Sequence, residues 1–180
     1  MNDSGTIQRT SDTYMTDGVL RLGPLTVPQQ FSQFVIPLLD GSGSMRDEAA
    51  GGISKAQATN AAMRGLLTRM KVGRNAANFS CAVVSFDDKE SIRLRPTALA
   101  AVDENDDYDP LKGHGGGTRI DKALKAADAL IQEFFAKAPE GGVKHDAVIL
   151  LMSDGCCNEP EKTRAAVQRM KAAYGERVNI

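Results

Sequence analysis

The side chains best suited to chemistry are a carboxylate and two hydroxyls at Asp40, Ser42 and Ser44, directly after the apolar run at residues 34–39. If the chain stays extended past this run, alternate side chains point the same way, so these three groups converge. Oxygen ligands of this kind suit hard cations such as Mg²⁺, Mn²⁺ and Ca²⁺. The glycines between them add the backbone freedom that a tight ligand-bearing turn requires. The segment therefore predicts part of a cation site.

Two later segments carry further oxygen ligands. Thr118 follows three glycines, and Asp154 ends the apolar run at residues 146–153 and is followed by glycine, as Asp40 is. In open parallel sheets, ligands bind beyond the carboxyl ends of the strands. Both apolar runs predict strands, and Thr118 precedes the helix that leads to the second one. We therefore expect five oxygen-bearing side chains to meet at one edge of a sheet: Asp40, Ser42, Ser44, Thr118 and Asp154.

The pattern of apolar residues predicts the elements that position these groups. Continuous apolar runs indicate strands buried on both faces, an alternating run indicates an exposed antiparallel edge strand, and repeats of three or four indicate amphipathic helices. Strands are expected at residues 34–39, 78–86, 91–95, 146–153 and 177–180, and helices at 53–70, 118–138 and 160–174. Strands alternating with helices predict an α/β fold: an open, doubly wound, mostly parallel sheet with helices on both faces and one antiparallel edge strand.

Several local features are also predicted. Pro37 lacks an N–H group, so we expect a bulge or a lost hydrogen bond in the first buried strand. Ile53 is expected on the buried face of the first helix. Thr118 followed by Asp121 is typical of a helix N-cap, which could coexist with metal ligation. A short helix is expected near residues 98–102.

The length of 180 residues corresponds to about one domain. Residues 1–30 combine Ser, Thr, Asp, Gly and Pro with few large apolar groups, so we expect a loosely ordered leader there, with a short edge strand at residues 19–25. Residues 31–180 are expected to form the domain itself.

Composition excludes several classes of protein. The net charge of -1 gives no strong field for nucleic acid or an anionic membrane surface. We find neither an apolar run long enough to span a membrane nor the start of a signal peptide. The three cysteines are odd in number and two are adjacent, which fits a reducing compartment better than a disulfide framework. We therefore expect a cytoplasmic protein that binds neither nucleic acid nor membrane.

The sequences DGSGS at 40–44, GGGT at 115–118 with ALKAA soon after, and LLMSDG at 150–155 together resemble a von Willebrand factor A domain with a complete metal-ion-dependent adhesion site. The resemblance covers residues 31–180. It extends to intracellular bacterial members, such as those grouped with tellurium-resistance TerY proteins or encoded beside MoxR-type ATPases. Because the family usually continues with a further strand and a terminal helix, the resemblance implies that this domain lacks both.

The resemblance also implies roles for the five residues. Ser42 and Ser44 would coordinate the metal directly, Thr118 directly or through water, and Asp40 and Asp154 mainly through water. The function implied is protein–protein interaction, in which Mg²⁺, or alternatively Mn²⁺ or Ca²⁺, captures an Asp or Glu of a partner. A MoxR-type ATPase or a component of a bacterial stress-response or defence system is the implied partner.

Two other functions compete with this interpretation. A Mg²⁺-dependent phosphoryl-transfer enzyme could use Asp40 as its nucleophile. However, Ser42 stands where the acid–base carboxylate of an Asp-x-Asp motif would be, and neither a phosphate-binding loop nor a serine-hydrolase elbow is present. We therefore predict a non-enzymatic protein. A metal-free structural scaffold is the other alternative.

Three further features have open roles. Cys156 and Cys157 could be redox-active or bind a soft metal, although no second Cys or His pair accompanies them, and an unusual loop is the alternative. The acidic residues at 103–109 could hold Ca²⁺, but they lack the EF-hand pattern and fit a solvated loop. His114, beside the glycines, could reach the metal rim or a partner, or could be an ordinary loop histidine.

Overall fold

The computed structural model describes residues 13–16, 19–22, 31–137 and 143–180. Most of the expected leader therefore lies outside the described residues. Within it, β1 (Thr13–Thr16) and β2 (Val19–Leu22) pair in antiparallel fashion. A strand does form within the expected range of 19–25, but the prediction that it lies at the edge of the main sheet is wrong. Strand β2 forms a separate two-stranded sheet with β1 instead.

The main sheet contains five strands in the order β5-β4-β3-β6-β7. Its central strand β3 is parallel to both neighbours, β7 is parallel to β6, and β5 is antiparallel to β4 at one edge. The strands are β3 (Phe31–Asp40), β4 (Phe79–Phe86), β5 (Glu90–Ala98), β6 (Lys144–Met152) and β7 (Val178–Asn179). The expected α/β fold with one antiparallel edge strand is confirmed.

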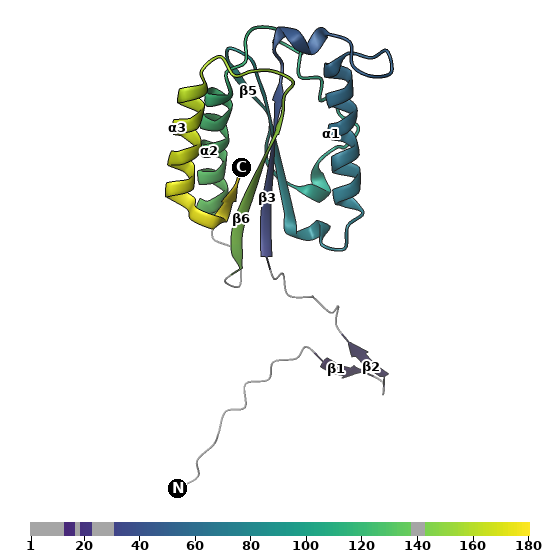
Figure 1. Cartoon of the computed structure of the whole chain (residues 1–180). Helices are drawn as coiled ribbons and strands as arrows, with labels where there is room; N and C mark the ends of the chain where they lie inside the picture. The colour runs from purple at the N-terminus through teal and green to yellow at the C-terminus, as the bar shows by residue number, and fades with distance from the viewer. Residues whose placement is uncertain (1–12, 17–18, 23–30, 138–142) are drawn as a thin grey trace.

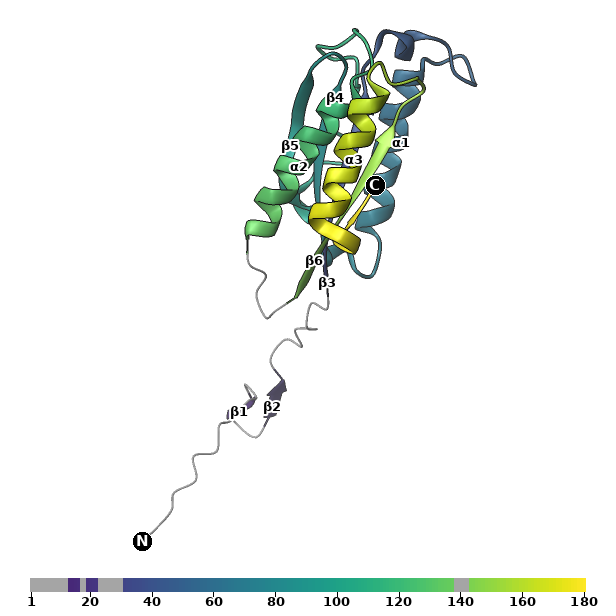
Figure 2. The same ribbon diagram turned by 60° about the vertical axis from the view of Figure 1, so that its left-hand side comes forward.

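Helices cover both faces of this sheet, as Figure 1 shows. Helix α1 (Lys55–Lys71) lies on one face, and α2 (Ile120–Ala136) and α3 (Pro160–Tyr174) lie together on the other. The view in Figure 2 shows α2 and α3 side by side in front of the sheet, with α1 behind it. Short 3₁₀ helices occupy Gly43–Arg46, Ala76–Asn78, Leu99–Ala101 and Gly175–Arg177. The helix expected near 98–102 is thus confirmed.

Alternate side chains of β3 enter the two cores. Phe34 packs on the α2 side, where its ring stacks on Phe134 with the centroids 4.6 Å apart, while Leu39 packs against Met63 and Leu67 of α1. Burying one such side chain stabilises a fold by roughly 1.5–3 kcal/mol. Packing on both faces therefore anchors the strand that carries Asp40 at its end.

Strand β6 is less well covered than expected. Its last residues lie beyond the two-residue strand β7, which pairs only with Ala147 and Val148. Leu151 consequently remains 48% exposed. The prediction of burial on both faces is therefore wrong for this end of β6.

Pro37 has the expected effect on pairing. The β3–β4 ladder omits Ile36 and Pro37, then resumes at Leu38 in the same register. The register shifts in this part of the sheet occur instead between β4 and β5, from Cys81 to Val84. A local loss of pairing is confirmed, whereas β3 itself has no bulge.

Helix α1 begins one residue after Ser54, which forms a capping box with Gln57. The Gln57 N–H donates to Ser54 Oγ at 3.1 Å, and the Ser54 N–H donates to Gln57 Oε1 at 2.9 Å. Ile53 therefore precedes the helix and is 40% exposed. Its expected place on the buried helical face is wrong.

Helix α2 begins without the expected cap. Its N-cap is Arg119, which makes no capping hydrogen bond through its side chain. Asp121 accepts two hydrogen bonds from the Arg119 guanidinium, each 2.8 Å long. The prediction that Thr118 caps this helix is therefore wrong. The predicted end of the helix at residue 138 lies outside the described residues. Within those residues, every helix is too short or too polar to cross a membrane.

Candidate functional site

Three loops meet beyond the carboxyl ends of β3 and β6, at the upper end of the sheet in Figure 1. The first follows β3 and carries Ser42 and Ser44. The second leads into α2 and carries Thr118, and the third follows β6 and carries Asp154. Parallel strands place these segments together because their carboxyl ends share one edge.

Asp40 organises the first and third loops from below. Its side chain is fully buried, with 0% of the residue exposed. Asp40 Oδ1 accepts the Ser42 N–H at 2.8 Å, and Oδ2 accepts the hydroxyl of Ser153. Both carboxylate oxygens therefore hold the loops that follow β3 and β6.

The two serine hydroxyls lie next to each other. Ser42 Oγ is 3.1 Å from Ser44 Oγ, and Ser44 Oγ donates to Asp154 Oδ1 at 3.0 Å. Adjacent oxygens on an octahedral Mg²⁺ with ligands at about 2.0–2.1 Å are roughly 2.9 Å apart. The serine spacing therefore fits two neighbouring ligands of one cation.

Thr118 borders the same space from the loop before α2. A β carbon at Gly155 would lie 3.5 Å from Thr118 Oγ1 and 4.0 Å from Ser44 Oγ. The two hydroxyls therefore flank the same small region beside Asp154. The structure brings together all five oxygen-bearing residues that the sequence singled out.

Asn158 links Thr118 to the loop after β6. The Asn158 N–H donates to Thr118 O at 3.0 Å, and the Thr118 N–H donates to Asn158 Oδ1. These two bonds fix the backbone of Thr118 against the loop that also carries Asp154. Sequence reasoning missed Asn158, because an Asn in a loop has no distinguishing pattern.

Asp87, at the end of β4, holds the glycine loop before Thr118. Its Oδ2 accepts the N–H groups of Gly115 and Gly116 at 3.0 Å each, and Oδ1 accepts the Lys89 N–H at 3.0 Å. His114 Nδ1 lies 2.9 Å from Oδ1. Burial alone would raise the pKa of Asp87, but the contact with His114 and these hydrogen bonds hold that pKa well below its usual range.

The glycines before Thr118 are required by close contacts. Gly115 has φ 144°, and a β carbon there would overlap the guanidinium of Arg46. A β carbon at Gly116 would overlap the carboxylate of Asp88, which accepts the Gly117 N–H at 2.9 Å. Polar side chains therefore pack directly on this backbone. Sequence reasoning noted the glycines but gave Asp87 and Asp88 no role.

Lys55 adds a positive charge at the rim of the site. Its ammonium group forms an ion pair with Asp154 Oδ2 and lies 3.7 Å from Asp47 Oδ2. The hydrogen bond with Asp154 raises the pKa of Lys55 and is the main cause that lowers the pKa of Asp154. The Asp154 side chain remains 19% exposed, so solvent reaches the site from this side.

The donor set fits a hard cation. Its central groups are neutral hydroxyls, with one buried and one partly exposed carboxylate around them, which is chemistry typical of Mg²⁺ rather than of softer metals. Among the residues that the structure describes, no three His, Cys, Asp or Glu side chains are grouped so as to hold a metal. A site built mainly from Ser and Thr does not depend on such a group.

His114 lies beneath the site instead of at its rim. Its side chain is 0% exposed and packs against Gly41, where a β carbon would be 2.7 Å from His114 Cβ. The expectation that His114 reaches the metal rim or a partner is therefore wrong, whereas its place in a loop is as expected. His114 supports the loop after β3 and the Asp87 carboxylate together.

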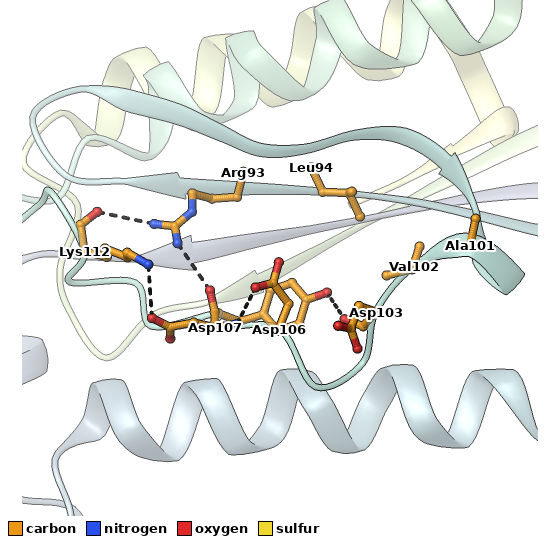
Figure 3. Close-up of a pocket in the computed structure, with 9 residues that line it drawn as sticks. Arg93, Leu94, Ala101, Val102, Asp103, Asp106, Asp107 and Lys112 are labelled. Atoms are coloured by element: carbon orange, nitrogen blue, oxygen red, sulfur yellow. Dashed lines mark hydrogen bonds and ion pairs between the residues drawn. The ribbon is translucent and has the colours of Figure 1, made fainter.

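The acidic loop at 103–109 is cross-linked to neighbouring elements. Lys71 pairs with Glu104, and Arg93 Nη2 donates to Asp107 O at 3.2 Å. A cavity of about 450 Å³ lies between β5 and this loop. Arg93 and Lys112 lie at one end of it, where Arg93 also donates to Lys112 O (Figure 3). Cationic side chains thus compensate part of the acidic charge, as expected for a solvated loop.

Residues 35–156 match the family model described as von Willebrand factor type A domain. No curated protein matches the chain. Among solved structures, the PilB minor pilin from Streptococcus sanguinis aligns with a TM-score of 0.53 and 18% identity, over 76% of this chain and 32% of that one. The pilus adhesin SpaC from Lactobacillus rhamnosus GG aligns with a TM-score of 0.53 and 17% identity, over 71% of this chain and 16% of that one. This chain thus spans less than half of either protein, and these likenesses show the fold.

Proposed function

The chain belongs to the von Willebrand factor type A domain family, and from that premise we propose that it is a non-enzymatic interaction module that captures an acidic side chain of a partner through a divalent cation. Domains of this family commonly mediate protein–protein interaction. The observation that supports the proposal most directly is the 3.1 Å spacing of Ser42 Oγ and Ser44 Oγ beside Asp154 and Thr118.

We assign the residues as follows. Ser42, Ser44 and Thr118 would hold Mg²⁺, or Mn²⁺ or Ca²⁺, through their hydroxyls, and Asp40 and Asp154 would act mainly through water. Hydroxyl ligands are neutral and leave a bound divalent cation with uncompensated charge, which favours the binding of an external carboxylate. Asp40 supports this arrangement because its two oxygens hold the loops after β3 and β6, and each can still accept a hydrogen bond from a metal-bound water.

The same burial argues against the rival phosphoryl-transfer enzyme. A nucleophilic Asp40 would need one free oxygen at the mouth of the site, but the residue is 0% exposed and both oxygens accept hydrogen bonds. In addition, the hydroxyl of Ser42 cannot replace an acid–base carboxylate. The interaction function therefore fits the geometry better than catalysis does.

The partner is proposed from chemistry and resemblance. An exposed Asp or Glu is the group that the site would capture. A cytoplasmic MoxR-type ATPase, or another component of a bacterial stress-response or defence system, is the partner that the resemblance to TerY-like members suggests.

Calorimetric titration with MgCl₂, MnCl₂ and CaCl₂ tests the cation site. Wild-type protein should bind at least one of these ions, and Thr118→Ala should weaken binding by about tenfold or more. The matched control is Thr68→Ala, because Thr68 lies exposed near the far end of α1 and donates to Arg64 O at 3.0 Å. If wild-type protein takes up none of the three ions, the metal-free scaffold is the better interpretation.

A pull-down with wild-type bait and with Asp40→Ala bait tests the adhesive function. Partners captured with Mg²⁺ present should be released by EDTA and absent from the variant. Capture that persists unchanged in EDTA would contradict a metal-dependent interface, whatever the affinity of the domain for the ion.

A further inference from the structure

Two adjacent thiols lie within the loop that completes the candidate site. Cys156 and Cys157 are both free; Cys156 is exposed and Cys157 is partly buried. They stand between Asp154, which binds Ser44, and Asn158, which fixes Thr118. A conformational change in this dipeptide would therefore affect the contacts of both Asp154 and Asn158 with the candidate site.

Cys157 anchors this loop to helix α3. Its Sγ lies 3.0 Å from Thr163 Oγ1 in the first turn of the helix and accepts the Glu159 N–H at 3.4 Å. Glu159 is the N-cap of α3 but makes no capping bond through its own side chain. The Cys157 sulfur thus takes over part of the capping role.

We propose that Cys156 and Cys157 form a reversible vicinal disulfide when a hydroperoxide oxidises the protein, and that this bond loosens the cation site. The exposed Cys156 thiolate attacks one peroxide oxygen and is oxidised to a sulfenic acid, while the O–O bond breaks and the other oxygen takes up a proton and leaves as water or an alcohol. The Cys157 thiol then loses its proton and its sulfur attacks the Cys156 sulfur, and the S–O bond breaks. The departing hydroxide takes up the Cys157 proton and leaves as water.

Geometry makes this disulfide easy to reverse. Neighbouring α carbons lie about 3.8 Å apart across a trans peptide bond, below the roughly 4.4–6.8 Å of ordinary disulfides. Strained and exposed disulfides are more readily reduced than structural ones. A thiol reductant should therefore restore both cysteines.

Formation of the bond would detach Cys157 from α3. A disulfide sulfur has no S–H group to donate to Thr163 and is drawn towards Cys156, so its contacts with Thr163 and Glu159 would weaken. The loop between Asp154 and Asn158 would have to shift, and with it the two hydrogen bonds between Asn158 and Thr118. The effect on cation binding rests on the proposed function, whereas disulfide formation and loop opening do not.

Cys81 is an internal control for this reaction. It is 1% exposed in β4, and burial raises its pKa to about 12. Because the thiolate is the reactive form, Cys81 should remain reduced under conditions that oxidise the loop pair. The Cys81→Ala variant should therefore behave as the wild type does.

Treatment with hydrogen peroxide followed by intact-mass measurement and peptide mapping tests the modification. The expected product is a monomer that has lost two hydrogen atoms, carries a Cys156–Cys157 bond and regains its mass with dithiothreitol. Cys156→Ser should not form this product. Free thiols at both positions, stable over-oxidation of Cys156 or a cross-link between two chains would each overturn the proposal.

Amide hydrogen exchange and Mg²⁺ titration of the reduced and oxidised protein test the consequence. Exchange at residues 154–159 and 115–118 should be faster after oxidation, and Mg²⁺ affinity should fall by about tenfold. Unchanged exchange would overturn the link between the thiols and the loop. If neither form binds Mg²⁺, Mn²⁺ or Ca²⁺, the proposed function fails, while mass and exchange still decide whether the disulfide forms and opens the loop.

Discussion

Replacing Asp87 by Asn should loosen the candidate site although Asp87 is not one of its proposed ligands. Asp87 is 5% exposed, and its two oxygens serve the N–H groups of Lys89, Gly115 and Gly116. The side-chain amide of Asn has one oxygen and one NH₂ group. Whichever way it is turned, its NH₂ group faces donors that the carboxylate had satisfied.

The magnitude follows from these contacts. Hydrogen bonds to a charged group contribute about 1.5–3 kcal/mol each, and removing one member of a buried charged set costs about 3–5 kcal/mol. We therefore expect Asp87→Asn to lower the free energy of unfolding by about 3–5 kcal/mol. Since Gly115 and Gly116 lead into Thr118, cation affinity should also fall, by roughly 10–100-fold.

Urea unfolding followed by circular dichroism, together with metal titration, measures both effects. The matched control is Asp88→Asn, because Asp88 is exposed and, among the described residues, its carboxylate accepts one hydrogen bond, from the Gly117 N–H. This variant should change the unfolding free energy by no more than about 1 kcal/mol. Equal small effects in the two variants would refute the assignment of Asp87 as the support of the glycine loop.

The Asp87 contacts also make stability depend on pH. Burial works to raise the pKa of Asp87, but the contact with His114 and the hydrogen bonds from Lys89, Gly116 and Gly115 outweigh it and lower that pKa. A carboxyl with a lower pKa in the folded chain stabilises the fold fully above its unfolded pKa of about 3.9. This stabilisation is lost as the pH falls through the folded pKa. The stability difference between wild type and Asp87→Asn should therefore shrink on acidification below about pH 4.

Two further substitutions probe the site by metal titration. Asn158→Ala removes the acceptor of the Thr118 N–H and should weaken cation binding by about tenfold, whereas wild-type affinity would show that Thr118 is held by other contacts. Lys55→Met removes the ammonium that competes for Asp154 Oδ2 and should strengthen cation binding severalfold, while Lys55→Arg, which keeps the charge, should not. Weaker binding in Lys55→Met would mean that Lys55 positions Asp154 instead of competing for it.

The fold could be predicted from the sequence because its elements rest on local patterns. The apolar run at 34–39 and the helical repeat at 160–174 reappear as β3 and α3, the latter with the same bounds. Local patterns failed where a stronger contact intervened. Asp121 pairs with Arg119 instead of joining a cap, and the Ser54–Gln57 capping box leaves Ile53 outside the helix.

The five oxygen-bearing residues could also be named in advance, because parallel strands necessarily bring their carboxyl ends to one edge. Ser44 and Asp154 meet although 110 positions separate them, since β3 and β6 are adjacent. The groups that support these residues could not be named. Asp87 contacts Gly115 across 28 positions, and nothing in the turn after β4 marks its carboxylate as buried.

Residue types and spacing alone thus determined the layered fold and the oxygen groups at its edge, because hydrophobic periodicity and strand polarity are properties of the chain itself. Tertiary structure alone decided that Asp87 holds the glycine loop, that Asn158 fixes Thr118 and that Lys55 forms an ion pair with Asp154. These contacts depend on how loops that follow different strands pack against one another. Burial and distance, which no stretch of sequence contains, give those side chains their roles.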